Sequence, residues 1–400
     1  MNKTCTIERK LNEIAQVLFQ HIDNQCTEDY SSMGLYSDKS GIILFLSHYL
    51  HNYPNPKFKR TYERYLNNFL KKLTDEPQIV LNYCSGLAGV FATLRMMNDN
   101  ALIKLDYSNV EEAYITSMRS WIDNCFSNSN FDFFYGAIGA TMYFKDHPQY
   151  INDDLLWLEK TAIKDANKYK WSSSLGRDKP NGYNIGLAHG MSSIIIYLSQ
   201  IYQSGVLTEL NSKLLEGTIS YVLSQEIDHS QYGCYFPSQS IENGEPITKS
   251  RLGWCYGDLG IAAALWQAGN ATKNDLWINK ALEGYRFSTK RKNLSDAMVV
   301  DAGLCHGTSS IAMMFSYIYR ETSEELFKNV RDYWVDQTLN MSRFPDGLAG
   351  YKQFIFDGNK QVIWGNSYSL LEGIAGIGLM LLSLLNFNAE KDLLTSFALY

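Results

Sequence analysis

Three residues in the second half of the chain have the types and spacing of a zinc site. Cys255 lies two residues before a glycine, and Cys305 and His306 directly precede Gly307. Two thiolates and an imidazole are a common ligand set for Zn²⁺, and three protein ligands leave a fourth position open for a substrate. Consecutive residues of a regular helix point about 100° apart, so Cys305 and His306 can bind one metal only at a helix start or a turn.

The cysteines belong to a motif that recurs along the chain. In each copy two small residues, usually glycines, stand three positions apart and open an apolar run. The first small position is occupied in turn by Asp38 (a degenerate copy), Gly86, Gly136, Gly190, Gly257, Gly307 and Gly373. Ser193 and Ser310 replace the second glycine in two copies. Successive copies lie 48 to 67 residues apart, which is room for two helices and their turns.

The apolar runs predict helices that are buried on most sides, as over residues 87–96. Amphipathic helices are predicted between the motifs, as over residues 57–73. This alternation predicts an all-α fold in which an inner ring of helices is surrounded by an outer ring, an α/α toroid. We expect a single domain over residues 1–400. Two longer spacings predict insertions over the rim: turns with short strands at 231–249, and a β-hairpin at 351–364.

The residues before each first glycine lie at the same end of the inner helices, so we expect them to converge where a site is built. His189 takes the position that His306 has in its own motif and is a candidate acid or base, although a lone histidine is also common in a core. Tyr256 is a candidate donor to developing oxyanion charge, or a packing residue. Asp132 and Arg251, four residues before Gly136 and Cys255, are candidates for an ion pair across the pocket.

Composition excludes several classes of function. The net charge of -6 gives no basic footprint for nucleic acid. Seven scattered cysteines do not form a disulfide framework, and Cys84 is expected to serve packing alone. The N-terminus lacks a signal peptide, and the most apolar stretch, 373–387, is too short to span a bilayer. We therefore expect a soluble, cytoplasmic protein.

With these motifs the sequence resembles the lanthionine synthetase C family, in particular its class I lanthipeptide cyclases of the nisin cyclase group. The resemblance is sharpest at Asn184–Gly190, Arg251–Gly257 and Cys305–Gly307. It implies an α/α toroid of seven inner and seven outer helices. It also implies zinc on Cys255, Cys305 and His306, with His189, Tyr256, Arg251 and Asp132 as the other active-site residues. The implied reaction is Michael-type addition of peptide cysteine thiols to dehydrated Ser or Thr residues, which forms thioether rings.

Other functions remain open at this stage. A relative of the same family could add glutathione to dehydroamino acids. A protein prenyltransferase β subunit also combines a zinc thiolate with an α/α toroid, but the blocks around Cys255 and Cys305 argue against it. A non-catalytic zinc-bearing scaffold for peptides is the third alternative. The implied partners of a cyclase are a dehydrated precursor peptide, a dehydratase and a membrane transporter, which would bring it to the inner face of the membrane.

Overall fold

The glycine motifs mark the starts of the most deeply buried helices. The computed structural model describes residues 2–24, 33–37, 39–75, 80–172, 183–244, 246–356, 359 and 361–400. The first glycine of a motif caps each of six helices: α4 (Leu87–Asp99), α6 (Ala137–Thr141), α8 (Met191–Ile201), α11 (Asp258–Thr272), α14 (Thr308–Thr322) and α16 (Ile374–Ser383). Helix α2 (Lys39–Asn52) begins directly after Asp38, which lies outside the described residues.

Close approach of the preceding loop explains the glycines. A Cβ atom on Gly190 would lie 2.1 Å from the carbonyl oxygen of Asn184, and one on Gly373 would lie 2.4 Å from that of Ser367. The same two carbonyls accept hydrogen bonds from Met191 and Ile374, the first residues of α8 and α16. Each loop therefore folds back onto its helix start, and only glycine leaves room for it.

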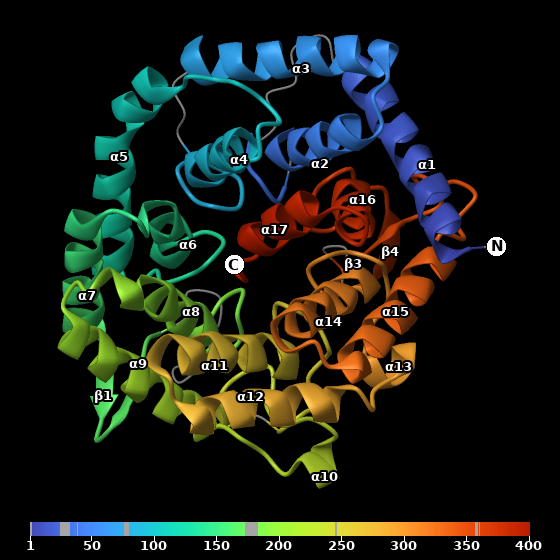
Figure 1. Ribbon diagram of the computed structural model, residues 1–400. Coiled ribbons are helices and arrows are strands. Elements are labelled where there is room, and N and C mark those ends of the chain that lie inside the picture. Colours follow the sequence, from blue (N-terminus) through green and yellow to red (C-terminus); the bar gives the residue numbers. More distant parts are fainter. Residues whose placement is uncertain are drawn as a thin grey trace. The chain divides into compact units, whose positions relative to one another are not determined.

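The chain forms two compact units, Met1–Thr116 with Val300–Tyr400, and Ser117–Val299. Helix α5 (Ser108–Ser127) contributes residues to both. In the first unit, half-buried helices pack around α2, α4, α14 and α16 (Figure 1). These outer helices are α1 (Lys3–Asn24), α3 (Pro56–Asp75), α15 (Glu325–Asn340) and α17 (Phe387–Ser396).

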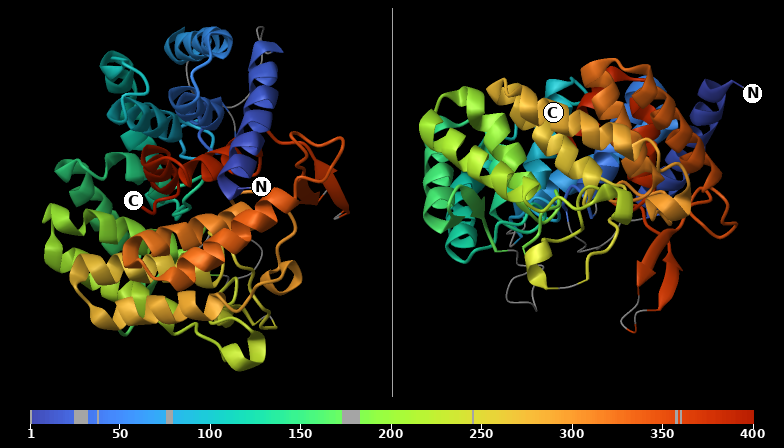
Figure 2. Two further views of the ribbon diagram at one scale, coloured as in Figure 1. Left: turned by 45° about the vertical axis from the view of Figure 1, so that its right-hand side comes forward. Right: turned by 90° about the horizontal axis from the view of Figure 1, so that it is seen from below.

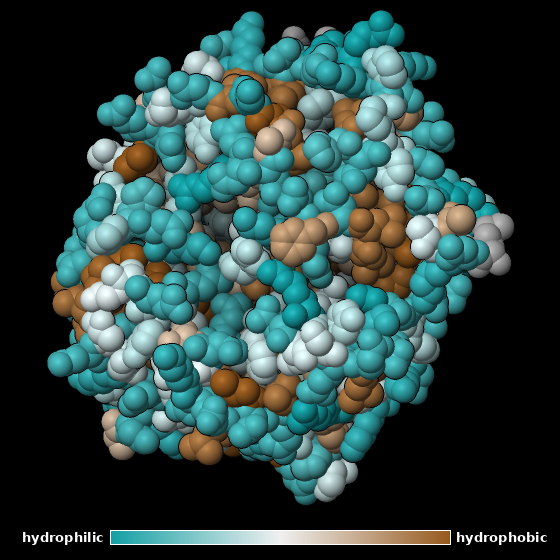
Figure 3. All heavy atoms as spheres, in the orientation of Figure 1, coloured by the Kyte–Doolittle hydropathy of each residue, from teal (hydrophilic) through white to brown (hydrophobic). Residues whose placement is uncertain are grey.

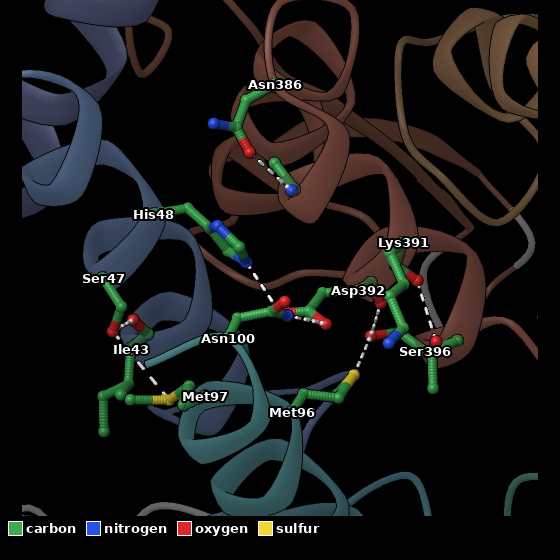
Figure 4. Close-up of polar contacts among 12 residues, drawn as sticks. Ile43, Ser47, His48, Met96, Met97, Asn100, Asn386, Lys391, Asp392 and Ser396 are labelled. Carbon is green, nitrogen blue, oxygen red and sulfur yellow. Dashed lines mark hydrogen bonds and ion pairs between the residues drawn. The ribbon is translucent and has the colours of Figure 1, made fainter. Parts of the chain in front are cut away.

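A polar network holds three helices of the first unit together in its core (Figure 4). The Nε2 atom of His48 on α2 lies 2.7 Å from a carboxylate oxygen of Asp392 on α17. Asn100, at the end of α4, donates to the other oxygen at 2.7 Å. His48 and Asp392 are almost fully buried, and burial raises the pKa of the Asp392 carboxyl. These bonds satisfy Nε2 of His48 and both carboxylate oxygens of Asp392, polar atoms that are costly to bury without partners.

In the second unit, α8 and α11 lie side by side, and α9 (Thr208–Leu223) and α12 (Asp275–Ser288) pack on them (Figure 1). Helix α7 (Pro148–Thr161) packs on α9. The remaining elements are short: η1 (Met142–Phe144), β1 (Ile163–Asp165), β2 (Lys168–Lys170), η2 (Tyr202–Ser204), α10 (His229–Tyr232), η3 (Ile241–Asn243) and α13 (Leu294–Ala297).

Neighbouring motifs are joined by backbone hydrogen bonds in one repeated register. In the first unit, the N–H groups of Leu304 and Cys305 donate to the carbonyl of Leu371. In the second, those of Leu187 and Ala188 donate to the carbonyl of Cys255. Each acceptor is the residue two positions before the first glycine of the next motif. The structure thus confirms that the motif positions of neighbouring repeats correspond.

The predicted insertions have different structures. Strands β3 (Gln353–Phe356) and β4 (Val362–Gly365) form an antiparallel hairpin that projects from the helices of the first unit, as predicted (Figure 2). In the described part of residues 231–249 the chain forms the end of α10, bends and η3, and the short strands predicted there are absent. That segment bonds to other elements instead of to itself: the N–H groups of Tyr235 and Phe236 donate to Asp258 on α11.

The surface is consistent with helices that bury their apolar sides. The face drawn in Figure 3 is mostly hydrophilic, and its hydrophobic residues lie in scattered patches. Among the described residues, no helix is both long enough and apolar enough to cross a membrane.

Candidate active site

The second unit brings His189 and Asp132 into direct contact. The Nδ1 atom of His189 lies 2.6 Å from Oδ2 of Asp132. The other carboxylate oxygen accepts the backbone N–H groups of Phe134 and Tyr135, both at 2.8 Å. An ionised carboxylate only accepts hydrogen bonds, so we place a proton on Nδ1 of His189. Its Nε2 is then the atom that can exchange a proton with a substrate.

Aromatic rings hold this imidazole in place. Phe134 meets the His189 ring edge to face at a centroid distance of 5.0 Å, and Trp254 stacks on Phe134 at 5.6 Å. Tyr256 lies on another side, with its ring centroid 5.9 Å from that of His189. Asp132 is buried, whereas the side chain of His189 keeps 13% of its surface exposed. The histidine is thus fixed by packing but accessible to a bound molecule.

Asn184 connects the two loops that carry His189 and Tyr256. Its side-chain amide donates to the hydroxyl oxygen of Tyr256 at 3.2 Å, and its side-chain oxygen accepts the N–H of Gly186 at 2.9 Å. A Cβ atom on Gly186 would lie 2.8 Å from the Tyr256 ring. Tyr256 therefore has a fixed position beside His189, with its hydroxyl oxygen accepting from Asn184.

A narrow cavity lies behind the His189–Asp132 pair. It is lined by both residues together with Asn184, Trp171 and Met191 among others, and its volume is about 10 Å³. That volume accommodates a single water molecule at most. This cavity is therefore too small for a substrate.

The ion pair predicted between Arg251 and Asp132 does not form. The half-buried Arg251 forms no ion pair with any residue that the structure describes. The acceptor atoms of Asp132 are taken by His189 and two backbone N–H groups. Arg251 does shape the turn that follows it, because its carbonyl oxygen would lie 2.5 Å from a Cβ on Gly257, whose φ is 83°. The turn before α11 therefore requires glycine.

The cysteines proposed as metal ligands form no disulfide bond and occupy buried positions. Cys255 precedes α11 in the second unit, and Cys305 precedes α14 in the first. Cys305 and the half-buried His306 lie in a turn and not on a regular helix. This is the local geometry that lets two consecutive side chains bind one metal.

Two carboxylates accompany His306 within the first unit. A ring nitrogen of His306 and carboxylate oxygens of Asp301 and Glu372 all lie within 4.8 Å of one another. Neither acid is among the site residues predicted from the sequence. The repeat pattern holds a signal for Glu372, because it occupies the same motif position as His189, Tyr256 and His306. Asp301 and Asn184 also share a motif position, since each lies six residues before the first glycine of its motif.

Comparison with known proteins identifies the family. A model described as lanthionine synthetase C-like protein matches residues 30–397. The chain belongs to the lanthionine synthetase C-like family. It is 23% identical over 356 residues to the nisin biosynthesis protein NisC of Lactococcus lactis subsp. lactis, covering 82% of this chain and 83% of NisC. It is also 22% identical over 383 residues to the glutathione S-transferase LANCL1 of Danio rerio, covering 88% of each chain.

A solved structure confirms the fold. Nisin cyclase matches this structure with a TM-score of 0.74 at 18% sequence identity, over 98% of this chain and 97% of the cyclase. The all-α fold predicted from the repeats, an α/α toroid with short β insertions, is thereby confirmed.

Proposed function

We propose that this protein is a lanthipeptide cyclase. It would join the cysteine thiols of a dehydrated precursor peptide to dehydroalanine or dehydrobutyrine residues, which forms lanthionine and methyllanthionine rings. Family membership and the likeness to NisC support a reaction of this class. The observation that carries the proposal is the His189–Asp132 pair, held beside Tyr256 in the loops that precede two buried helices.

The residues that would bind zinc are Cys255, Cys305 and His306. The donor set fits the metal, because both cysteines are buried and form no disulfide bond and because His306 follows Cys305 in a turn. Bound zinc would lower the pKa of a peptide thiol and keep it as a thiolate nucleophile. The ligands of a catalytic zinc ion leave one position open for such a thiol.

His189 would deliver the proton that completes the addition. The reaction forms a bond between the peptide sulfur and the β-carbon, and the electron pair of the C=C bond moves toward the carbonyl oxygen. The α-carbon must then take a proton, which Nε2 of His189 can donate when the ring is protonated at both nitrogens. Asp132 stabilises that imidazolium through the hydrogen bond to Nδ1.

Tyr256 and Arg251 would act on the charge that develops on the carbonyl oxygen. The Tyr256 hydroxyl accepts from Asn184 and would donate its own hydrogen to a substrate oxygen. Arg251 carries a positive charge in the same segment as Cys255 and would position the peptide carbonyl. Tyr256 is also a second candidate for the proton donor, which substitution of each residue separates.

A peptide with one dehydroalanine and one cysteine tests this function. Ring formation is an isomerisation, so the peptide should lose its alkylatable thiol without a change of mass. The expected result is thiol loss catalysed by the wild type and greatly slowed in His189→Asn. Binding of the peptide with no loss of thiol would contradict the proposal and favour a non-catalytic scaffold.

The relative LANCL1 supports a second candidate, the addition of glutathione to dehydroamino acids. The same assay in the presence of glutathione distinguishes the two reactions. A cyclase leaves the peptide mass unchanged, whereas a glutathione transferase adds the mass of one glutathione and leaves the peptide cysteine free. We favour the cyclase because NisC matches both in sequence and in fold.

The proposed chemistry also indicates partners and a compartment. The substrate must first lose water from its Ser or Thr residues, so we propose transient contact with a dehydratase and, for export of the product, with a membrane transporter. Both would act on the cytoplasmic side. Cell fractionation tests this proposal: we expect the protein in the cytoplasm, with a membrane-associated share that disappears when the transporter is deleted. Secretion of the protein would contradict it.

A further inference from the structure

Glu372 is the one strongly acidic side chain at the motif position that carries His189, Tyr256 and His306. The register of hydrogen bonds places it relative to His306 as Tyr256 is placed relative to His189. Leu304 and Cys305 donate to the carbonyl of Leu371, just as Leu187 and Ala188 donate to that of Cys255. Since Tyr256 contacts His189 in one pair of repeats, Glu372 should contact His306 in the other.

The side-chain positions agree with this register. A carboxylate oxygen of Glu372 lies within 4.8 Å of a ring nitrogen of His306. Gly303 makes room for the carboxylate: a Cβ atom there would lie 3.0 Å from Oε2 of Glu372. Glu372 is half-buried, so solvent screens its charge only in part.

Asp301, the other nearby acid, already has hydrogen-bond partners. Its Oδ1 accepts the N–H of Gly303 at 3.1 Å, and its Oδ2 accepts the N–H of Phe354 on β3 at 3.0 Å. Asp301 is buried and braces the loop against the hairpin. It therefore fixes the backbone before Cys305, and Glu372 is the carboxylate better suited to bind the imidazole.

We infer that Glu372 is a positioning residue that orients the His306 ring for metal binding. This inference rests on the proposed zinc site. A carboxylate that accepts the N–H of a metal-bound histidine fixes its tautomer and orientation and makes the other nitrogen a stronger ligand. Glu372 acts through His306 and does not touch the substrate.

Glu372→Gln tests the inference, because it keeps the shape of the side chain and removes its charge. Glu390→Gln is the matched control: Glu390 is also a half-buried glutamate of the first unit, and it accepts from Ser316 at 3.0 Å. Zinc affinity is measured by competition with a chromophoric chelator, and the thiolate-to-metal absorption band is recorded after cobalt substitution. We expect affinity to fall about 10–100-fold in Glu372→Gln, while the control matches the wild type.

The metal stoichiometry, the thiolate band and the melting temperature of the metal-free protein should not change in Glu372→Gln. Gly303→Ala is a second variant: its Cβ would lie 3.0 Å from Oε2 and 3.3 Å from Cα of Glu372, so it should shift this residue without removing the carboxylate and also weaken zinc binding. Unchanged affinity in both variants would overturn the inference. So would complete loss of metal in Glu372→Gln, because that result would make Glu372 a ligand. A wild type that binds no zinc would instead overturn the metal site itself and the inference with it.

Discussion

The site is organised around single residues whose partners define their chemistry. The motif position of His189 makes it a candidate acid or base, and in the structure its Nδ1 lies 2.6 Å from the buried carboxylate of Asp132. This contact selects the tautomer that carries its proton on Nδ1, and the other nitrogen, Nε2, faces away from the carboxylate. Asp132 in turn is fixed by two backbone N–H groups. The pair is preorganised for proton transfer, which is what the proposed reaction requires after the sulfur has added.

Asp132→Asn should therefore reduce activity without loss of zinc. The asparagine oxygen can still accept from Phe134 and Tyr135, but its amide presents a donor to Nδ1 and favours the wrong tautomer of His189. We expect the rate of thiol loss to fall at least about 100-fold. The control is Asp165→Asn on the exposed strand β1, which should retain full activity. Normal activity in Asp132→Asn would remove Asp132 and its hydrogen bond from the mechanism.

At the scale of elements, the loops before the buried helices position every candidate residue. Their geometry depends on glycine because the loop backbone folds back onto the helix start. His189 directly precedes Gly190, so a change of that loop moves His189 relative to Asp132. The first glycine of each motif thus connects the fold to the site.

Gly190→Ala should destabilise the protein, since its Cβ would lie 2.1 Å from the carbonyl oxygen of Asn184. We expect a loss of about 1–3 kcal/mol in the free energy of unfolding, together with reduced activity. Gly284→Ala on α12 is the matched control. There the nearest atom is the Ala262 Cβ at 3.4 Å, and higher helix propensity should add about 0.5–1 kcal/mol. Urea unfolding of both variants measures the difference, and equal stabilities would refute this account of the motif.

Asp258, the first residue of α11, anchors the inserted segment by accepting from Tyr235 and Phe236. Burial raises the pKa of its carboxyl from 3.8 to about 6. The folded state therefore binds a proton more readily than the unfolded state. Ionisation of this carboxylate lowers the free energy of unfolding above about pH 6, and the loss disappears as the pH falls toward 4. This shift of the Asp258 pKa corresponds to about 3 kcal/mol in the free energy of unfolding.

Asp258→Asn should remove this pH dependence while keeping the two backbone hydrogen bonds. As the pH rises from 4 to 7, the free energy of unfolding of the variant should increase by up to about 3 kcal/mol relative to that of the wild type. Urea unfolding at several pH values measures it. A difference that is independent of pH would show that Asp258 titrates normally.

For the whole molecule, the repeat pattern was sufficient to predict the buried helices and the equivalence of their motif positions. It also placed Cys305 and His306 in a turn, and it predicted the hairpin of β3 and β4. The hairpin of β1 and β2 was missed because its turn contains no glycine: Ala166 takes a φ of 51° there. The segment 231–249 lacks strands in its described part because it bonds to Asp258 and its neighbours, and such long-range pairing leaves no local pattern.

The contacts within the candidate site could also be predicted only in part, because they join residues far apart in the sequence. Motif position predicted His189 and Tyr256 as neighbours and also marked Glu372. The role of Glu372 became apparent only from the position of its carboxylate within 4.8 Å of a His306 ring nitrogen. The partner of Asp132 was not predictable, because spacing along the chain gives no side-chain direction. Asp132 pairs with His189 and not with Arg251. The equivalence of the repeats predicts which residues lie at the same end of the buried helices. The structure is needed to show which of their side chains are in contact.

Zinc content per chain, measured by elemental mass spectrometry, tests whether the protein binds the zinc ion that the proposed reaction requires. The wild type should contain about one zinc ion, and Cys255→Ala and Cys305→Ala should lose it. Cys84→Ala should keep it, because Cys84 is buried and forms no disulfide bond but occupies the same motif position in another repeat. Absence of zinc from wild-type protein purified without chelator, and no uptake on reconstitution, would contradict the proposed site and with it the cyclase chemistry.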